Sequence, residues 1–374
     1  MKSHTLCYTI TAVCILAVVL LLTGLHPFDS ETAESVSPVQ TGRFLPGEEF
    51  IRTHMINDDG TLKTNLQPHE AVDPNIAQGE ETLSESIGLW MMYAVEKGDK
   101  PLFQQNVDVL QKKFMKEGLI YWKLGPKPVS TNALIDDLRI AEALYKAHSL
   151  WGSAQYRDLA NQIAQSLTER QIVDGVFTDF YDDQSEWTSQ TLTLSYLKTA
   201  AFAQMYQNGA LDSSIYEGTV QFLRELPMRN GFFPFQYDVQ DKTYTYHQQV
   251  NIIDQLYIVY HRAQAQTTSP ELWSFLKAEF EKRGFLYGRY TADTKQPAVD
   301  YESPAVYGLA ILAAVELDDE EFAKDLYYRM IRHQMLNPES KYYGGYTYDD
   351  DTHIFDNLIP LVAERKMFNR GLLR

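Results

Sequence analysis

The sequence predicts an all-α domain, an (α/α)6 toroid in which six outer helices surround six inner ones. Two observations predict it. Beyond residue 43, segments that are apolar almost all round alternate with amphipathic segments, a pattern that indicates buried helices covered by outer helices. Aromatic loops join these segments, and their starts lie 53 to 58 residues apart. A fixed period of this size is typical of repeated supersecondary units that share one core.

The elements follow in order along the chain. Inner helices are predicted at residues 86–95, 133–151, 188–206, 251–263, 303–317 and 355–365. Outer helices are predicted at 45–56, 100–117, 154–170, 213–226, 271–283 and 319–334. The aromatic loops start at Gly118, Gly175, Gly231, Gly284 and, in a looser copy, Tyr342. An open tetratricopeptide-type solenoid is the alternative, but its period is shorter, at ~34 residues.

The first thirty residues differ from the rest of the chain. They combine a short basic start, an uncharged apolar run from Leu6 to Leu25 and a polar tail, as a signal peptide or an N-terminal membrane anchor does. Residues 31–43 are then a linker, and residues 44–374 form the toroid. Both cysteines, Cys7 and Cys14, lie in the apolar run, and an exported domain without cysteine favours a bacterial source. We expect a protein that is secreted or anchored to the outer face of the cytoplasmic membrane.

Charge and motifs exclude several classes of function. The net charge of −17 argues against nucleic acid or anionic lipid as a partner, because both require basic patches, whereas a neutral or cationic polymer is compatible. The sequence has no GxSxG elbow, P-loop, GxGxxG or HExxH motif. The acidic run from Asp349 to Asp351 lacks the rest of an EF-hand loop, so we interpret it as a solvated turn. We expect a monomer without metal or cofactor.

Polar residues gather near the start of each predicted inner helix. Because the inner helices of a toroid run parallel, these starts converge on one mouth, rimmed by the aromatic loops. Helix capping accounts for Ser84, Ser303 and Asp136. It does not account for Asp137 and Asp254, which lie among apolar residues, since a buried carboxylate costs free energy unless it is paired or protonated. We therefore interpret the mouth as the functional site.

Two carboxylates in a largely apolar cleft are the apparatus of glycoside hydrolysis, in which one carboxyl is kept protonated and the other ionised. Aromatic side chains beside them would stack on sugar rings. Core packing explains Trp90 better, and Phe235 is a further possibility. The predicted substrate-binding residues are Asp136 and the aromatic residues Trp122, Tyr181, Trp187, Tyr246 and Tyr301.

Two stretches, LSESIGLWMMYAVEKGDKPLF and DDLRIAEALYKAHSLW, resemble glycoside hydrolase family 8, the bacterial inverting endoglucanases, chitosanases and xylanases on an (α/α)6 barrel. The resemblance implies that Glu85 is the general acid and that Asp137 binds the sugar at the cleavage point. It also implies that Asp254, in NIIDQLYIVY, is the general base. The chain departs from the family pattern, since Ile135 replaces the first acid of the signature and the arginine and proline usual near the base are missing. It therefore resembles a divergent member.

The apolar N-terminal run, the carboxyls at the mouth and the family resemblance together predict an exported, endo-acting, inverting glycosidase. Its predicted substrate is a β-linked polysaccharide such as a glucan, chitosan, xylan or an exopolysaccharide. A catalytically decayed carbohydrate-binding protein on the same fold is the first alternative. A lyase or an unsaturated-uronide hydrolase on a similar barrel is the second. Enzymes of that kind act on acidic glycans and require cationic side chains at the cleft, where Arg139 is the main candidate.

Overall fold

A computed structural model describes residues 45–68, 77–127 and 129–373. These residues all belong to one compact unit, residues 40–374. The predicted signal or anchor segment and the linker, residues 1–43, lie outside the described residues, so the domain boundary at residue 44 stays a prediction. Within the described ranges, no helix is both long and apolar enough to cross a bilayer.

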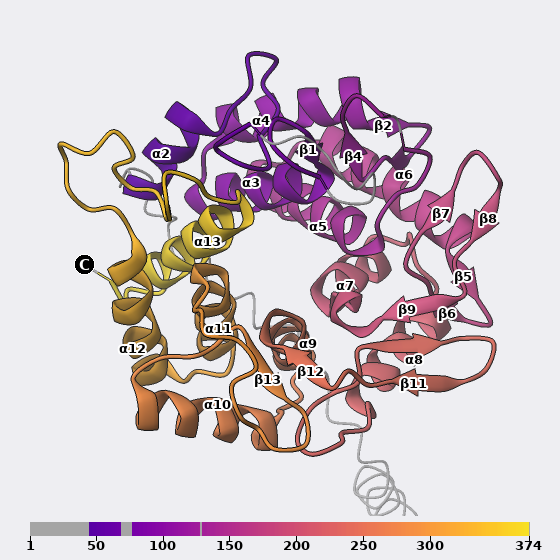
Figure 1. The fold of residues 1–374 in the computed structure, drawn as a ribbon. Helices are drawn as coiled ribbons and strands as arrows, with labels where there is room; N and C mark the ends of the chain where they lie inside the picture. Colours follow the sequence, from indigo (N-terminus) through magenta and orange to yellow (C-terminus); the bar gives the residue numbers. More distant parts are fainter. Residues whose placement is uncertain (1–44, 69–76, 128, 374) are drawn as a thin grey trace, which may run out of the picture. The chain divides into compact units, whose positions relative to one another are not determined.

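The described part of the chain contains twelve α-helices that form two concentric rings (Figure 1). The inner helices are α3 (Ser84–Lys97), α5 (Leu134–Trp151), α7 (Thr199–Gln207), α9 (Ile252–Gln264), α11 (Pro304–Glu316) and α13 (Phe355–Asn369). The outer helices are α2 (Pro46–His54), α4 (Lys100–Val109), α6 (Ala154–Arg170), α8 (Ser213–Arg224), α10 (Pro270–Arg283) and α12 (Glu320–Met330). Each inner helix packs on the next, and α13 packs on α3 to close the ring. The predicted (α/α)6 architecture is confirmed.

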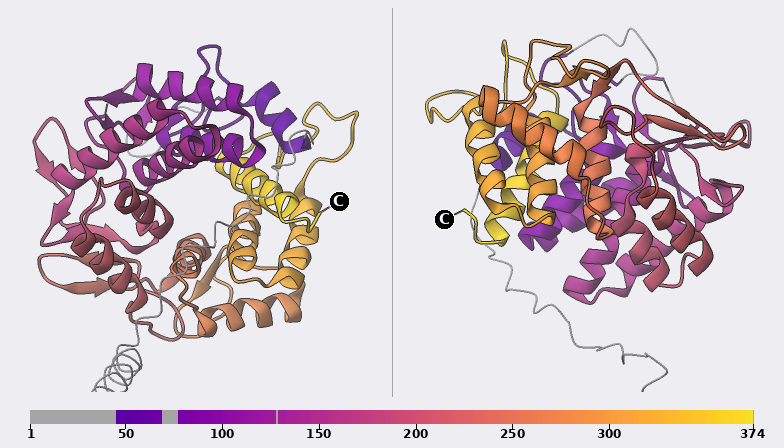
Figure 2. Two further views of the ribbon diagram at one scale, coloured as in Figure 1. Left: turned by 180° about the vertical axis from the view of Figure 1, so that it is seen from behind. Right: turned by 90° about the horizontal axis from the view of Figure 1, so that it is seen from below.

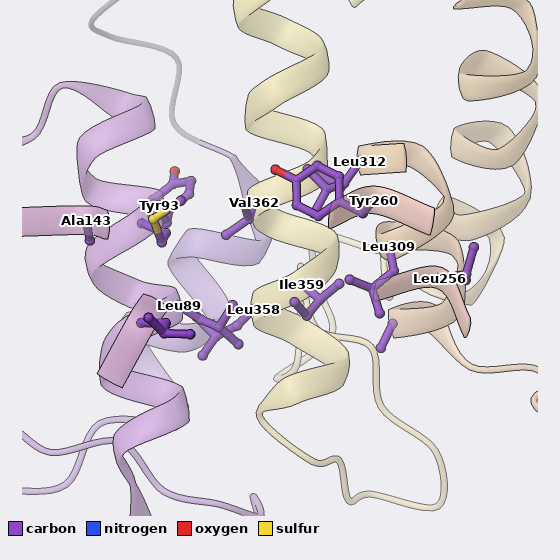
Figure 3. Packing of buried hydrophobic residues seen from close by; sticks show 14 of the residues in the cluster. Leu89, Tyr93, Ala143, Leu256, Tyr260, Leu309, Leu312, Leu358, Ile359 and Val362 are labelled. Atoms are coloured by element: carbon purple, nitrogen blue, oxygen red, sulfur yellow. The ribbon is translucent and has the colours of Figure 1, made fainter. Parts of the chain in front are cut away.

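The sequence pattern explains which helices are inner. Every residue of α11 from Ala305 to Val315 is buried, whereas α12 buries only the stripe of Phe322, Ala323, Leu326 and Met330. An all-round apolar helix is stable only when neighbours cover every face. Figure 2 shows the outer helices surrounding the inner ring in the view from behind, and Figure 3 shows the side chains packed between the inner helices.

One glycine controls how closely two inner helices approach. A Cβ atom added at Gly308 of α11 would lie 2.8 Å from Cγ2 of Ile359 and 2.9 Å from the backbone nitrogen of Pro360, both on α13. Contacts this short do not occur, so any larger residue would push α11 and α13 apart. The helix ends depend on glycine as well. Gly98 and Gly152 adopt the left-handed conformation that ends α3 and α5.

Short antiparallel strands occupy the loops between the helices. Five two-stranded pairs form among the described residues: β1 (Thr82–Leu83) with β4 (Lys123–Leu124), β2 (Met115–Lys116) with β3 (Leu119–Ile120), β5 (Ile172–Val173) with β6 (Val176–Phe177), β7 (Tyr181–Asp182) with β8 (Trp187–Thr188), and β12 (Gln249–Asn251) with β13 (Arg289–Thr291). A three-stranded sheet has the order β11 (Thr243–Thr245), β10 (Gln236–Asp238), β9 (Thr191–Thr193). These strands hold the aromatic loops that were predicted to rim the mouth.

The third inner helix differs from the prediction. It was expected at residues 188–206, but α7 begins only at Thr199, after strand β9 and a 3-10 turn at Leu194–Tyr196. Alternating threonines favour a strand here, because β-branched residues suit a pleated surface. Asp179 then holds the strand, since its carboxylate accepts hydrogen bonds from the backbone N–H of Thr193 and the hydroxyl of Thr191.

The outer helix predicted at 100–117 is also shorter. Helix α4 ends at Val109 and continues as a π-helical turn at Leu110–Phe114 before β2.

Candidate functional site

Three hydrogen bonds join the starts of neighbouring inner helices. The hydroxyl of Ser84 donates to Asp136 over 2.8 Å, which links α3 to α5. The hydroxyl of Ser303 donates to Asp356 over 2.7 Å, which links α11 to α13. That of Ser195, just before α7, donates to Asp254 of α9 over 3.2 Å. The inner helices therefore begin side by side at one end of the ring, which we call the mouth.

These bonds correct one expectation. Ser84, Ser303 and Asp136 were predicted to cap their own helices, but none of them makes a capping hydrogen bond. Ser84 is the first residue of α3, where the cap position is occupied by Leu83, and its hydroxyl bonds to Asp136 of the next helix instead. The physical reason is that Asp136 is buried on the neighbouring helix, and a buried carboxylate without a hydrogen-bond donor is costly.

Glu85 lies in the first turn of α3, and its side chain is 26% exposed. The helix start is held by the backbone N–H of Ser84, which donates to the carbonyl of Trp122 over 2.9 Å. Burial raises the pKa of Glu85 to about 7, and the negative charge of Asp136 acts in the same direction, against the lowering effect of Arg139. At neutral pH this carboxyl therefore holds its proton part of the time, as a general acid must.

Arg139 is the buried cation beside Glu85. It is 3% exposed, and one guanidinium nitrogen lies 3.8 Å from a Glu85 oxygen. The guanidinium also donates to Asp136 over 2.8 Å and to the hydroxyl of Tyr257 over 3.2 Å. Arg139 therefore ties α3, α5 and α9 together behind the acid. A charge buried this deeply is tolerated because its hydrogen bonds are satisfied by groups of opposite charge or polarity.

Asp137 lies behind the mouth. It is 1% exposed, and one carboxyl oxygen accepts a hydrogen bond from Asn132 over 2.7 Å, while the other has no hydrogen-bond partner. Burial raises its pKa well above the usual range, despite the bond from Asn132. Successive residues of a helix project about 100° apart, so Asp136 and Asp137 cannot both face Glu85. The structure places Asp136 there, and it does not bring Asp137 to a surface that a sugar could reach.

Asp254 lies in the first turn of α9, beside a cavity of ≈ 30 Å³ that Phe235, Tyr246 and His247 also line. That space is enough for a water molecule. Burial raises the pKa of Asp254, whereas the hydrogen bond from Ser195 and the charges of His247 and Arg289 lower it. The chain has no arginine close in sequence to Asp254, and Arg289 of strand β13 contributes the positive charge instead.

The charges of both carboxylates reach Tyr196, which the sequence analysis missed. Burial raises its pKa, and so do the negative charges of Asp136, Asp179, Glu85 and Asp254. One phenol thus lies within electrostatic range of Glu85 and Asp254 together. It was missed because residues 188–206 were interpreted as one helix. The alternation in TLTLSY is the signal that could have revealed a strand ending in an accessible tyrosine.

The predicted aromatic residues fall in several places. The backbone carbonyl of Trp122 accepts a hydrogen bond from the backbone N–H of Ser84, the residue before Glu85. Trp187 is 48% exposed on β8 and lies opposite Asp182 of β7, whereas Tyr181 of β7 lies opposite Thr188. Tyr246 shares the cavity of Asp254. Tyr301 is 50% exposed and lines a separate pocket at the starts of α11 and α13.

Trp90 and Phe235 were the other aromatic residues considered for stacking on a sugar. Trp90 is 2% exposed and stacks on Tyr93 at a ring distance of 5.2 Å, so it belongs to the core. Phe235 stacks on His247 at 4.3 Å. Among the described residues, no group of three His, Cys, Asp or Glu side chains could hold a metal ion.

Comparison with known proteins gives consistent results. The sequence profile of glycosyl hydrolases family 8 matches residues 48–208. YdaJ of Bacillus subtilis (strain 168), which is named as a lipoprotein, is 40% identical over 348 residues, covering 92% of this chain and 91% of YdaJ. A solved structure described as a novel alpha-amylase from Clostridium perfringens is 26% identical, with a TM-score of 0.78 over 86% of this chain and 96% of that chain.

A family member of known structure shares the fold. The endoglucanase Cel10 of Klebsiella pneumoniae, a family 8 glycosyl hydrolase, superposes with a TM-score of 0.62 over 86% of this chain and 98% of that chain, at 16% identity. That likeness concerns the barrel alone. The profile match covers the helices that carry Glu85, Asp136 and Arg139. The chain therefore belongs to glycosyl hydrolases family 8.

Proposed function

We propose that the protein is an exported glycoside hydrolase that cleaves a β-linked polysaccharide internally and with inversion. The observation that carries this proposal is a pair of carboxyls, Glu85 and Asp254, in the first turns of two inner helices that begin at the same mouth. Burial raises the pKa of both, to about 7 for Glu85, while the hydrogen bond from Ser195 and the charges of His247 and Arg289 oppose burial at Asp254. We assign Glu85 as the acid and Asp254 as the base, because glycoside hydrolysis uses one protonated and one ionised carboxyl.

In the proposed reaction, Glu85 donates its proton to the glycosidic oxygen as the bond to the leaving sugar breaks. Asp254 takes a proton from a water molecule that attacks the anomeric carbon from the opposite face. Inversion requires the two carboxyl groups to lie about 6.5–9.5 Å apart, so that the water fits between them. Arg139 and Asp136 hold Glu85 from behind.

The role of Asp137 as the residue that binds the sugar stays a prediction, and its burial does not support it. Asp136 is better placed to act on Glu85. The aromatic residues Trp122, Trp187, Tyr181, Tyr246 and Tyr301 remain the proposed sugar-stacking positions.

A second candidate differs in the linkage. The similarity to a protein described as an alpha-amylase favours an α-linked glucan as the substrate, because amylases cleave α-linkages. The same two carboxyls would serve, since an inverting mechanism works on either anomer. The name of YdaJ as a lipoprotein supports export with attachment to the membrane.

The test is the release of reducing ends by the full-length protein from carboxymethylcellulose, mixed-linkage glucan, xylan, chitosan and starch. Glu85→Gln is the inactive partner, and Glu217→Gln, an exposed glutamate of the outer helix α8, is the matched control. Activity on a β-glycan that Glu85→Gln loses and Glu217→Gln keeps supports the proposal, and activity on starch alone supports the second candidate. Binding without any hydrolysis would identify a decayed, purely carbohydrate-binding protein. The anomer formed first, observed by NMR, distinguishes inversion from retention.

A further inference from the structure

The third inner helix, α7, begins late. It has nine residues, whereas the other five inner helices have 13 to 18. The chain reaches α7 through a 3-10 turn at Leu194–Tyr196 and two residues that lie outside any helix. Irregular backbone lacks the regular series of hydrogen bonds that fixes an α-helix. The position of residues 194–199 at the mouth therefore depends on what their side chains contact.

Three side-chain contacts fix residues 194–199. The hydroxyl of Ser195 donates to Oδ1 of Asp254 over 3.2 Å. The hydroxyl of Thr199 donates to the backbone carbonyl of His261 over 2.6 Å, so that both contacts join the segment to α9. The ammonium of Lys198 lies 2.7 Å from a carboxylate oxygen of Glu142 on α5. The segment is thus attached to α9 on one side and to α5 on the other.

The pair of Lys198 and Glu142 is buried, with side chains 7% and 0% exposed. Burial lowers the pKa of Lys198, and the charge of Glu142 opposes that effect. Replacing a buried ion pair by apolar residues is often neutral or stabilising, so stability alone does not explain this pair. An ammonium at this depth must stay beside a carboxylate, which fixes the backbone that carries Lys198. Glu142 lies one turn after Arg139 on α5, so this fixed point belongs to the helix behind the acid.

We propose that Ser195 is a positioning residue for the base, Asp254, and that the buried ion pair between Lys198 and Glu142 holds Ser195 in place. The inference rests on the proposed function and deepens it by assigning the groups that orient the base. Ser195 and Lys198 are three residues apart in irregular backbone, so a shift of the lysine moves the serine hydroxyl. The serine occupies Oδ1 of the aspartate, so Oδ2 is the oxygen that takes the proton from water.

The surroundings of Asp254 show what loss of this hydrogen bond should do. Burial raises the pKa of Asp254, and the largest opposing influence is the hydrogen bond from Ser195, followed by the charges of His247 and Arg289. A hydrogen bond to the charged form favours that form. The serine therefore helps to keep the base ionised, and its displacement should raise the pKa of Asp254 while His247 and Arg289 stay in place.

The test is a carbon-13 NMR titration of the full-length protein labelled at its aspartate carboxyl carbons, with the Asp254 signal assigned by its loss in Asp254→Asn. Ser195→Ala should raise the pKa of Asp254 by about one unit, because a hydrogen bond to a charged group is lost. Lys198→Met should raise it by a similar amount. The double variant should raise it no further than either single change, because both act through the same hydrogen bond.

Lys146→Met is the matched control. Lys146 lies 2.9 Å from the carboxylate of Glu142 but belongs to the same helix, α5, four residues along. Each single lysine variant therefore leaves Glu142 with the other lysine as its partner. Both variants should lower the melting temperature, whereas only Lys198→Met should move the pKa of Asp254. A purely structural role of the ion pair would give the two variants the same effect.

Hydrolysis gives a second measurement. On a polysaccharide that the wild type cleaves, the acid limb of kcat/KM against pH should move to higher pH by the same amount in Ser195→Ala and Lys198→Met. A shift of one unit makes kcat/KM about tenfold lower on that limb. KM should stay unchanged, since the sugar contacts are intact.

Three results would overturn the proposal: an unchanged pKa of Asp254 in Ser195→Ala or Lys198→Met, equal shifts in the two lysine variants, or shifts that add in the double variant. These results are distinct from failure of the proposed function, because the NMR titration does not require hydrolysis. The expected shifts in a protein that cleaves nothing would leave the arrangement around Asp254 standing without the reaction. Hydrolysis that Glu85→Gln abolishes, without a shift in Lys198→Met, would leave the glycosidase standing without this positioning pair.

Discussion

Glu85→Gln should stabilise the protein at alkaline pH, although it abolishes the proposed reaction. The pKa of Glu85 in the folded protein is about 7, against 4.5 for an unperturbed glutamate. The ionised carboxylate is therefore disfavoured by the folded state, because burial outweighs the attraction of Arg139. Each pH unit of such a difference corresponds to 1.36 kcal/mol, so ionised Glu85 costs ~3 kcal/mol of folding free energy once the pH exceeds 7.

The sign of the pH dependence follows from the same values. Below pH 4.5 both states bind the proton and the group has no effect, between pH 4.5 and 7 only the unfolded chain ionises, and above pH 7 the full cost is present. Glutamine matches the protonated acid in shape and does not ionise. The variant should therefore exceed the wild type by ~3 kcal/mol at pH 8 and by less than ~1 kcal/mol at pH 5.

Differential scanning calorimetry at these two pH values measures the difference. For a domain of this size ~3 kcal/mol corresponds to a rise in Tm of about 4 °C. Glu217→Gln on the outer helix α8 serves as the control, since it removes a carboxylate from an exposed site. An equal gain at pH 5 and pH 8, or a loss at pH 8, would refute the assignment of Glu85 as a carboxyl that burial keeps protonated.

Three further predictions concern the base, the buried cation and the barrel. Asp254→Asn should lower kcat about 10³-fold while leaving oligosaccharide affinity unchanged in calorimetry, and a change in KM alone would contradict its role as the base. Arg139→Gln removes the charge that lowers the pKa of Glu85, so the alkaline limb of kcat/KM against pH should move to higher pH. Arg139→Lys should return that limb part of the way to its wild-type position. Gly308→Ala should cost about 1–3 kcal/mol in urea unfolding, because its Cβ would overlap Ile359, and an unchanged midpoint would show that α11 and α13 separate freely.

Much of the ring could be predicted from local pattern. The residues of α11 and α12 differ in how many of their faces are apolar, and that difference alone distinguishes an inner helix from an outer one. The position of Glu85 was predictable too, because a carboxylate at the start of an otherwise apolar helix is costly without a purpose. Residues 188–206 were misjudged since their strand exists only through pairing with β10 and hydrogen bonds to Asp179, which are partners distant in sequence.

Local sequence pattern was sufficient to predict the alternation of inner and outer helices, the loops between them and the set of carboxyls near the helix starts. Tertiary contacts were needed to show which of two adjacent aspartates faces Glu85, that the charges of both Glu85 and Asp254 reach Tyr196, and that Tyr301 leaves the rim to line a pocket of its own. The two kinds of information differ in their range along the chain. Helix formation and amphipathicity depend on neighbours a few residues apart, whereas the direction of a side chain at the mouth depends on hydrogen bonds between helices 52 to 59 residues apart in the chain.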